Sequence, residues 1–297
     1  MNKTLRLSII KHTLEKVREL PTLPVVAHKV SMLLSDPNSS ASELSEVITI
    51  DQSITAKILK LVNSACFALP QRVKNIKQAI GLLGYRNVSH IVLTLSVFDT
   101  LKKSNRSVFD RRAFWLHSIA TAIMSLKIAK ACLYRSEDDV FTAGLLHDIG
   151  KVFMDGFLHE FFCKIIDHAQ ENGQSFHASE RALFDVDHAM IGEWMARSWT
   201  FPLLIIAVIK HHHQQQHERK GLVISSDVVV DFVNLADVTV RREGYGTSGD
   251  GKGFVPMISP ELFRRLPISE TDVNIMLESL KKDVENSKTL LDLAIEE

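Results

Sequence analysis

The sequence predicts an all-α, multi-helix protein, and three observations support this fold class. The chain holds 13 glycines and 8 prolines among 297 residues, roughly 7% against an average near 12%. So few turn-forming residues favour long uninterrupted helices over many short strands. Apolar residues recur at helical spacing along most of the chain. A content of 45% hydrophobic and 24% charged residues is typical of a globular chain that can bury a core.

The first hundred residues predict a series of short helices that pack together. Ser40, with Glu43 three residues later, matches a capping box and predicts the start of a helix. Apolar stripes at i, i+4 and i+7 spacing follow, and Gly84 is placed to end the second of them. The last segment is apolar nearly all round, which indicates a buried connecting helix. The helices expected after the capping box cover residues 54–65, 76–83 and 88–101.

A polar and charged stretch at residues 102–112 (KKSNRSVFDRR) predicts a domain boundary. A second helical series follows it. Pro202 fits the first turn of one of these helices, and Asp227 is a plausible cap for the last. The helices expected here cover 114–131, 138–147, 160–171, 179–199, 202–213 and 227–242.

The remaining residues predict a loop and two C-terminal helices. Residues 244–253 hold five glycines, which predicts a flexible loop. This loop lacks the Gly-Lys-Ser/Thr sequence of a phosphate-binding loop, so its glycines do not by themselves indicate phosphate binding. Ser259 and Pro260 open a short helix, and 269–293 form an amphipathic helix whose apolar stripe is typical of a core contact. The predicted division is therefore an N-terminal helical subdomain (1–105), a second helical subdomain (106–243), a glycine-rich loop (244–258) and C-terminal helices (259–297).

Charge and cysteine content exclude several classes of protein. Thirty-five basic and 35 acidic residues cancel, whereas a nucleic-acid binder usually carries a surplus of Lys and Arg. The three cysteines are widely separated, with no Cys-x-x-Cys pair. The longest wholly apolar run, 201–209, is nine residues, far below the roughly 20 that span a bilayer. We expect a cytoplasmic protein that binds neither nucleic acid nor membrane.

Seven side chains of metal-binding type lie on or at the ends of the helices of the second half. A helical domain can point one ligand inward from each of several helices, so these residues can meet at one centre. Imidazole and carboxylate together suit Fe, Mn, Zn or Mg, and no thiolate is present to indicate a closed structural zinc site. The seven are His117, His147, Asp148, His188, His211, His212 and Asp237.

Each of these residues taken alone also fits a structural or surface role. A single histidine such as His117 is more often a hydrogen-bonded core residue than a ligand, and the histidines at 211–213 fit a solvated surface. The apolar sequence around His147 (AGLLHDIGKV) and Asp237 (VNLADV) favours a metal, because a buried charge needs compensation.

The motifs resemble those of the HD superfamily of metal-dependent phosphohydrolases. The string His147-Asp148-Ile149-Gly150-Lys151, with His117 before it and Asp237 after it, is similar to that family's H…HD…D signature. Three stretches of the first half are similar to the HDOD domain, an HD-related output domain of bacterial signalling proteins: LPTLPVV, LKLVNSACF and AIGLLGYRNV. ERALFDVDHAMIGEWMARSWTFP and AVIKHHH in the second half are also HDOD-like. The resemblance covers roughly residues 15–242.

The resemblance implies a ligand set and a phosphate contact. It implies a first metal on His117, His147, Asp148 and Asp237. It places His188, His211 and His212 where the HD-GYP cyclic di-GMP phosphodiesterases carry ligands for a second metal, and Lys151 where they place a phosphate-contacting lysine. No Gly-Tyr-Pro follows the histidine run, and Ala113 stands where some relatives supply a further carboxylate. We therefore expect no cyclic di-GMP hydrolysis.

Two functions remain open at this stage, and a third is chemically allowed. The preferred one is a signalling module that binds a protein partner or a nucleotide ligand, with one or two divalent metals in an intact HD site. The alternative is a metal-dependent phosphohydrolase or phosphodiesterase acting on a nucleotide or cyclic nucleotide. In that case Asp148 bridges two ions that activate a water for attack on phosphorus, and Lys151 neutralises the developing charge. A di-iron oxygenase also fits histidine and carboxylate ligands, but nothing in the sequence selects it.

Overall fold

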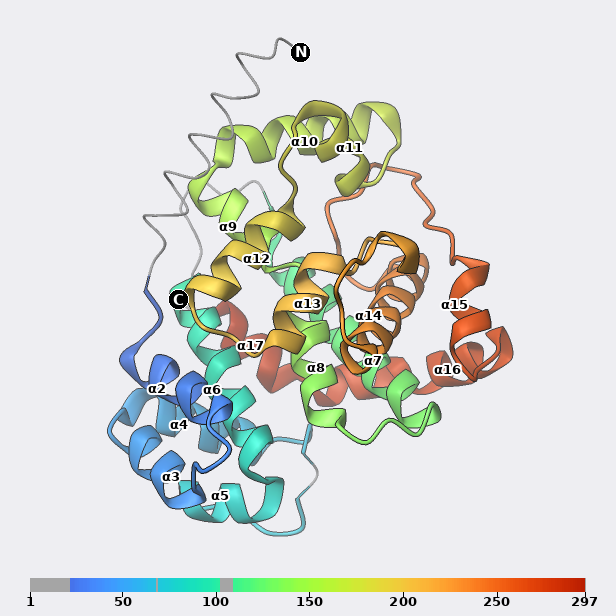
Figure 1. The fold of residues 1–297 in the computed structure, drawn as a ribbon. Helices are drawn as coiled ribbons and strands as arrows, with labels where there is room; N and C mark the ends of the chain where they lie inside the picture. Colours follow the sequence, from blue (N-terminus) through green and yellow to red (C-terminus); the bar gives the residue numbers. More distant parts are fainter. Residues whose placement is uncertain (1–21, 68, 102–108, 297) are drawn as a thin grey trace.

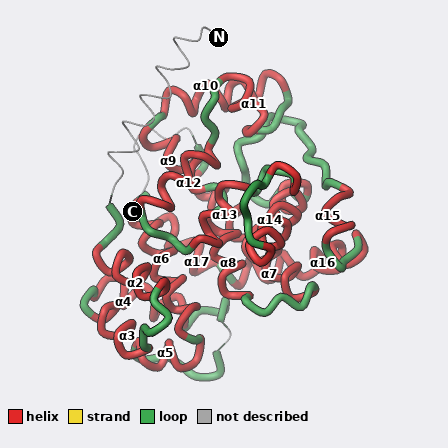
Figure 2. The backbone as a smooth tube through the Cα atoms, viewed as in Figure 1, coloured by secondary structure: helices red, strands yellow, loops and turns green. Residues whose placement is uncertain are grey.

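The structure confirms the all-α prediction. It is a computed structural model, and it describes residues 22–67, 69–101 and 109–296. These residues form helices and connecting loops without a β-strand, as Figure 2 shows. Within the same residues, no helix combines the length and the apolar character that crossing a bilayer requires.

Within the described residues, five helices form the N-terminal module, coloured blue to cyan in Figure 1. They are α2 (Val25–Ser35), α3 (Ala41–Thr49), α4 (Gln52–Val62), α5 (Ile76–Leu83) and α6 (Tyr85–Thr100). The predicted capping box is formed, because the Ser40 hydroxyl accepts from the Glu43 N–H and the Glu43 carboxylate accepts from the Ser40 N–H. Gly84 ends α5 with φ +88°, a conformation that favours glycine. Helix α6 is buried along most of its length, as its sequence predicted.

The second module is arranged around α7 (Arg111–Ala131), which packs against α8, α14, α16 and α17. The other elements of this module are α8 (Glu137–Leu146), α9 (Ile149–Phe157), α10 (His159–Asn172), α11 (Phe176–Leu183), α12 (His188–Ser198), α13 (Leu203–His211), the 3-10 turn η1 (Gln216–Glu218) and α14 (Ile224–Arg242). The C-terminal helices are α15 (Pro260–Arg265), α16 (Glu270–Asn286) and α17 (Lys288–Ile295).

The C-terminal helices close the fold across both modules. Helices α16 and α17 lie against α7, and α17 also reaches α4 and α6 (Figure 1). Val273 and Leu280 of α16 are buried, which confirms that the predicted stripe belongs to the core. The boundary predicted at 102–112 falls largely on residues 102–108, outside the described residues, and the predicted four-part division stays a prediction.

Three helix predictions were wrong in detail. The segment 179–199 is two helices, since Asp187 caps the second by accepting from the Met190 N–H at 2.8 Å. The segment 269–293 is also two helices, which meet at Ser287. Asp227 lies inside the first turn of α14 and does not cap it. Its carboxylate instead binds Arg219 and Arg265.

Candidate metal centre

Six of the seven predicted metal ligands meet in the interior of the second module, joined by a seventh residue that the prediction did not include. We call these seven residues the histidine–aspartate cluster. Apart from His213, which is half-buried, each is at most 2% exposed. The members are His117 from α7, His147 and Asp148 from the turn between α8 and α9, His188 from α12, His212 and His213 from the end of α13, and Asp237 from α14.

One half of the cluster, site A, contains His117, His147, Asp237 and one oxygen of Asp148. The Nε2 atom of His117 lies 3.2 Å from Asp237 Oδ1 and 3.9 Å from Asp148 Oδ2. The Nε2 atom of His147 lies 3.4 Å from Asp148 Oδ2 and 3.8 Å from Asp237 Oδ1. Two imidazole nitrogens and two carboxylate oxygens therefore converge on one small volume.

The other half, site B, contains His188, His212, His213 and the second oxygen of Asp148. Asp148 Oδ1 lies 3.1 Å from His188 Nε2 and 3.4 Å from His212 Nε2. His188 Nε2 is itself 3.0 Å from His213 Nε2 and 3.4 Å from His212 Nε2. The two oxygens of Asp148 thus face different sites, the arrangement expected of a bridging carboxylate.

Three of the histidines are oriented by their second ring nitrogen. His147 Nδ1 lies 2.7 Å from the Gly144 carbonyl oxygen, and His212 Nδ1 lies 2.9 Å from the Ile209 carbonyl oxygen. His188 Nδ1 lies 2.6 Å from Glu180 Oε2. A proton on each Nδ1 satisfies these acceptors and leaves the Nε2 lone pair directed into the cluster, as a metal-binding imidazole requires.

Glu180 contacts the histidine–aspartate cluster, and the sequence analysis did not identify it. It is fully buried and accepts from both the backbone N–H and the ring of His188. Two acidic residues close to His188 in sequence have other partners: Asp187 binds His177, and Glu193 binds Arg197 and Lys210. In a continuous helix, Glu180 and His188 would be separated by about 12 Å along the axis. The break between α11 and α12 brings them together.

His211 is not part of the cluster, which corrects the prediction that paired it with His212. Its Nδ1 lies 2.6 Å from Gln214 Oε1, and His213 takes its place in site B. Successive residues of a helix are rotated by about 100°, so both neighbours of His212 cannot point the same way. The sequence HHH identifies the run but does not identify which of the flanking histidines faces inward.

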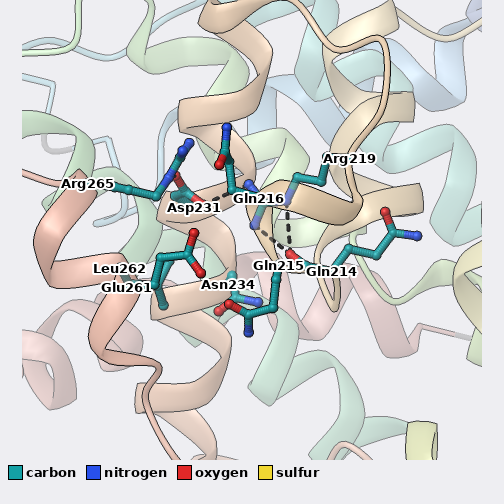
Figure 3. Close-up of a pocket in the computed structure, with 9 residues that line it drawn as sticks. All are labelled: Gln214, Gln215, Gln216, Arg219, Asp231, Asn234, Glu261, Leu262 and Arg265. Carbon is teal, nitrogen blue, oxygen red and sulfur yellow. Dashed lines mark hydrogen bonds and ion pairs between the residues drawn. The ribbon is translucent and has the colours of Figure 1, made fainter.

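A network of ion pairs, shown in Figure 3, holds the turn that presents His212 and His213. Arg219 donates to the Gln214 carbonyl oxygen at 2.7 Å and to Asp231 at 2.7 Å. Arg265 of α15 donates to the other oxygen of Asp231. Asn234 of α14 donates to the His212 carbonyl oxygen. These contacts fix the end of α13 to α14 and α15. Residues far along the chain therefore determine which histidines of the run point toward the cluster.

The predicted flexible loop is a closely packed segment, which we call the strap (residues 244–253). Gly246 has φ +69°, and a Cβ atom there would lie 2.1 Å from the Ala113 carbonyl oxygen. A Cβ atom on Gly251 would lie 1.9 Å from the Ala169 carbonyl oxygen. Asp250 accepts from Arg241 and from the Phe176 N–H, both at 2.9 Å. The glycines therefore permit close approach to neighbouring helices.

The strap brings Ser248 against Lys151. The Lys151 ammonium donates to Asp148 Oδ2 at 2.6 Å and to the Ser248 hydroxyl at 2.7 Å. It also lies 5.3 Å from the centre of the Phe176 ring. Lys151 is 1% exposed. Lys151 therefore lies beside Asp148, and the contacts described for its ammonium group are all with other residues of the protein.

The carboxylates of the cluster determine its electrostatics. Burial alone would raise the pKa of Asp148, but Lys151 and His147 lower it well below the ordinary value. Burial lowers the pKa of His147, and the nearby Asp148 and Asp237 outweigh this effect and raise it to about 9. Burial lowers the pKa of His212 to about 4. Burial alone would also raise the pKa of Asp237, but Arg241 lowers it well below the ordinary value, so both carboxylates of the cluster are ionised.

Five buried atoms of the cluster form no hydrogen bond within the described part of the chain. One is His117 Nδ1, and the other four, which take part in the short contacts of sites A and B, are His117 Nε2, His147 Nε2, Asp148 Oδ1 and Asp237 Oδ1. Leaving such groups unpaired costs about 1–3 kcal/mol each, and divalent cations in the two sites would compensate the last four. Imidazole with carboxylate suits Fe, Mn or Zn, and the carboxylates also suit Mg. The residues therefore fit a metal centre.

Comparison with known proteins places this geometry in context. The HDOD domain family matches residues 20–215. An uncharacterized protein of Treponema pallidum is 26% identical over 197 residues, 66% of this chain but 38% of that protein. The solved structure of an HDOD domain protein of unknown function from Geobacter sulfurreducens has a TM-score of 0.75 and 25% identity, and covers 99% of both chains. A Shewanella amazonensis protein, provisionally named a phosphohydrolase, has a TM-score of 0.72 at 21% identity over 94% of this chain and 98% of that one; it shares the fold.

Proposed function

The chain belongs to the HDOD domain family, and we propose that it is a regulatory signalling protein whose histidine–aspartate cluster holds two divalent metal ions. The observation that carries this proposal is the burial of Lys151 beneath the strap. In this role, the metal centre would hold the second module together. The protein would transmit a signal through its surface or through a bound ligand.

The proposed ligands follow the two halves of the cluster. His117, His147 and Asp237 would hold one ion in site A, and His188, His212 and His213 would hold the other in site B. Asp148 would bridge the two through its separate oxygens. Bound divalent ions supply Lewis acidity and lower the pKa of water. Glu180 would keep His188 oriented by holding the proton on Nδ1.

The contacts of Lys151 favour regulation over hydrolysis. A lysine that neutralises a substrate phosphate must present donors to the substrate. Here the ammonium group donates to Asp148 and Ser248 and lies near the Phe176 ring. The strap that supplies Ser248 is itself fixed by Asp250. The sequence also lacks the Gly-Tyr-Pro of the cyclic di-GMP phosphodiesterases.

The proposed partner is a second signalling protein or a nucleotide. The N-terminal module, proposed here to include residues 1–105, offers exposed apolar side chains for such a contact, including Val25 at 72% and Ile50 at 74% exposure. The chain covers little more than a third of the Treponema relative, so this partner function is proposed for the HDOD unit.

Metal analysis by mass spectrometry, together with a phosphodiesterase screen, tests the proposal. We expect two equivalents of metal in the wild type, none in Asp148→Ala, and two in the control Asp167→Ala on α10. We expect no turnover of bis(p-nitrophenyl) phosphate, nucleotides or cyclic nucleotides by the metal-loaded protein. Full metal occupancy in Asp148→Ala would contradict the assignment of the site.

The alternative function is a phosphohydrolase, which a cluster of metal-binding side chains with a lysine beside Asp148 would allow. This alternative predicts turnover by the metal-loaded wild type that is lost in Lys151→Met while both metals remain bound. Turnover with this pattern would replace the regulatory proposal by the enzymatic one.

A further inference from the structure

The strap (residues 244–253) lies against site A of the histidine–aspartate cluster. It follows α14, and in Figure 1 the chain then runs past α11 toward α15. The Thr247 N–H donates to the Ala113 carbonyl oxygen at 3.1 Å, one turn before His117 on α7. A Cβ atom on Gly246 would lie 2.6 Å from the backbone nitrogen of His117. The strap therefore touches the backbone of α7 at the point where this helix presents a side chain of site A.

A first link, which we call the lysine link, joins the strap to Asp148. Ser248 is 5% exposed, and its hydroxyl accepts from the Lys151 ammonium at 2.7 Å. The ammonium also donates to Asp148 Oδ2 at 2.6 Å, and the Ser248 hydroxyl lies 3.3 Å from the same oxygen. This oxygen is the one that faces His147 in site A. The strap therefore reaches one carboxylate of site A both directly and through a lysine.

A second link, which we call the arginine link, joins the strap to Asp237. Arg241 donates from one amino group to Asp250 Oδ2 at 2.9 Å and from the other to Asp237 Oδ2 at 2.8 Å. With Oδ2 bound to the guanidinium, Asp237 directs Oδ1 to within 3.2 Å of His117 Nε2. Because a guanidinium is planar and holds its donors in a fixed geometry, the position of Asp250 influences the orientation of the site A carboxylate.

The charges of the two links favour a cation in site A. The two carboxylates of this site each pair with one cation, Lys151 or Arg241, so these four groups carry no net charge. Asp250 adds one negative charge through its own ion pair with Arg241. The Asp250 side chain is 16% exposed, and a partly buried charge is screened much less than an exposed one. The strap therefore supplies the net negative charge of this group.

The described partners of site B come from other elements. His188 is oriented by Glu180 of α11, and Asn234 of α14 donates to the His212 carbonyl oxygen. The two sites thus share Asp148, but the lysine and arginine links of the strap both end on the oxygens that belong to the carboxylates of site A. A change in the strap is expected to act on one ion and leave the other.

We propose that the strap positions both carboxylates of site A through its two cation links, so that an ion in site A and the closed strap stabilise each other. This inference rests on the proposed function, because it concerns an ion held in site A. Coupling between two sites is reciprocal. If the strap strengthens binding of the ion, the ion must hold the strap closed by the same factor.

Titration of the chelator-treated full chain with Mn²⁺, followed by calorimetry, tests the arginine link. Asp250→Asn keeps the size of the side chain and removes its charge. It should weaken one of the two Mn²⁺ ions about tenfold, the lower end of the effect of a partner that orients a ligand. Asp283→Asn makes the same change in the ion pair between Asp283 and Lys127 and should leave both ions unchanged.

A double variant identifies the ion that is weakened. Glu180→Gln acts on His188 and therefore on site B. Combined with Asp250→Asn, it should leave both Mn²⁺ ions weakened, because the two changes act on different sites. One ion of wild-type affinity in the double variant would mean that the strap acts on site B, and this would overturn the inference.

Gly251→Ala tests the strap without a change of charge. A Cβ atom on Gly251 would lie 1.9 Å from the Ala169 carbonyl oxygen, so the strap must move away from α10. We expect the ion weakened in Asp250→Asn to be weakened here by a similar factor, about tenfold. Gly156→Ala adds the same methyl group on α9, where no atom lies within 4 Å, and should leave both ions unchanged.

Hydrogen exchange measures the reciprocal effect. The Gly251 N–H donates to the Gln174 carbonyl oxygen at 2.8 Å, so its exchange reports local opening of the strap. Saturating Mn²⁺ should slow this exchange at least about fivefold in the wild type, the lower end of the usual coupling between two sites. The slowing should be smaller in Asp250→Asn, whose arginine link is weakened.

The outcomes separate failure of this inference from failure of the metal proposal. A wild type that binds no Mn²⁺ would contradict the proposed function and this inference with it. A wild type that binds two ions, with Asp250→Asn and Gly251→Ala binding both as tightly, would overturn this inference alone. Exchange of the Gly251 N–H at the same rate with and without Mn²⁺ would do so too, because a strap that only packs against the helices does not respond to the ion.

Discussion

The N-terminal module and the second module are both helical, but they bury different kinds of side chain. The interior of α2–α6 is formed by residues such as Leu44, Ile58 and Val92, each fully buried. The interior of α7–α14 also buries charged groups such as Lys151 and Glu180, each at most 1% exposed. Apolar contacts hold the first module together, and such contacts do not require one specific partner for each side chain. The second depends on specific pairs and, we propose, on two ions.

This difference predicts different responses to mutation. Truncation of an apolar residue removes burial and leaves a cavity, whose cost depends on how far the neighbours relax. Truncation of one member of a buried ion pair leaves the other charge unpaired, which costs about 3–5 kcal/mol. The second module should therefore lose both stability and its metals when a single carboxylate is removed.

Asp148→Ala is expected to have the largest effect of all. It removes the proposed bridge between sites A and B and leaves the buried Lys151 ammonium without its carboxylate. We expect loss of both metals and a decrease of about 3–5 kcal/mol in the free energy of unfolding, measured by metal analysis and by urea denaturation. In the double variant Asp148→Ala/Lys151→Met, stability should recover in part while metal binding stays lost. A double variant no more stable than Asp148→Ala would show that the unpaired lysine is not the cause.

The sequence predicted the N-terminal module well because its signals are local. The Ser40–Glu43 capping box and the helix end at Gly84 each depend on residues within one turn. The apolar stripes then identify the buried faces without knowledge of their partners. The sequence also identified six of the seven residues of the histidine–aspartate cluster, since histidine and aspartate in apolar surroundings need compensation wherever they meet; that they bind metal stays a prediction.

The rest of the site depended on geometry that no local pattern carries. Glu180 reaches His188 only because the chain breaks between α11 and α12. His213 replaces His211 because the rotational phase at the end of α13 is set by Asn234 and the Arg219 network. The glycines of the strap are compatible with a flexible loop and also with a segment that packs closely on neighbouring helices. The sequence does not distinguish these two, because the packing depends on where the neighbouring helices lie.

Leu44→Ala tests the other side of the comparison. Leu44 is fully buried in α3, and its truncation should decrease the free energy of unfolding by about 2–5 kcal/mol. Metal content should stay at two equivalents, because α3 supplies no ligand. Denaturation and metal analysis on the same sample measure both quantities. Parallel loss of metal would mean that the two modules form one cooperative unit, and the contrast between them would then be one of composition only.

Glu180→Gln sharpens the comparison within the second module. Glutamine keeps the size of the side chain but weakens the acceptor that orients His188. Loss of such a partner typically lowers metal affinity by about 10–100-fold. We expect the ion of site B to weaken by this amount and the ion of site A to be retained, as measured by metal titration calorimetry. Glu193→Gln, which changes a carboxylate bound to Arg197 and Lys210, serves as the control and should bind both ions normally.

The smallest effect we predict separates two neighbouring histidines that the sequence cannot tell apart. His213 lies at the half-buried edge of site B, with its Nε2 3.0 Å from that of His188 and its ring stacked on His177 at 4.2 Å. His213→Ala should weaken the second ion about tenfold, or about 1.4 kcal/mol. His211→Ala should leave both ions unchanged, because His211 binds Gln214 outside the cluster. If a metal titration showed weaker binding of the second ion in His211→Ala and unchanged binding in His213→Ala, the orientation of these histidines at the end of α13 would be wrong. Equal and small effects would mean that His188, His212 and Asp148 suffice for the second ion, with the edge histidine contributing only its stacking contact.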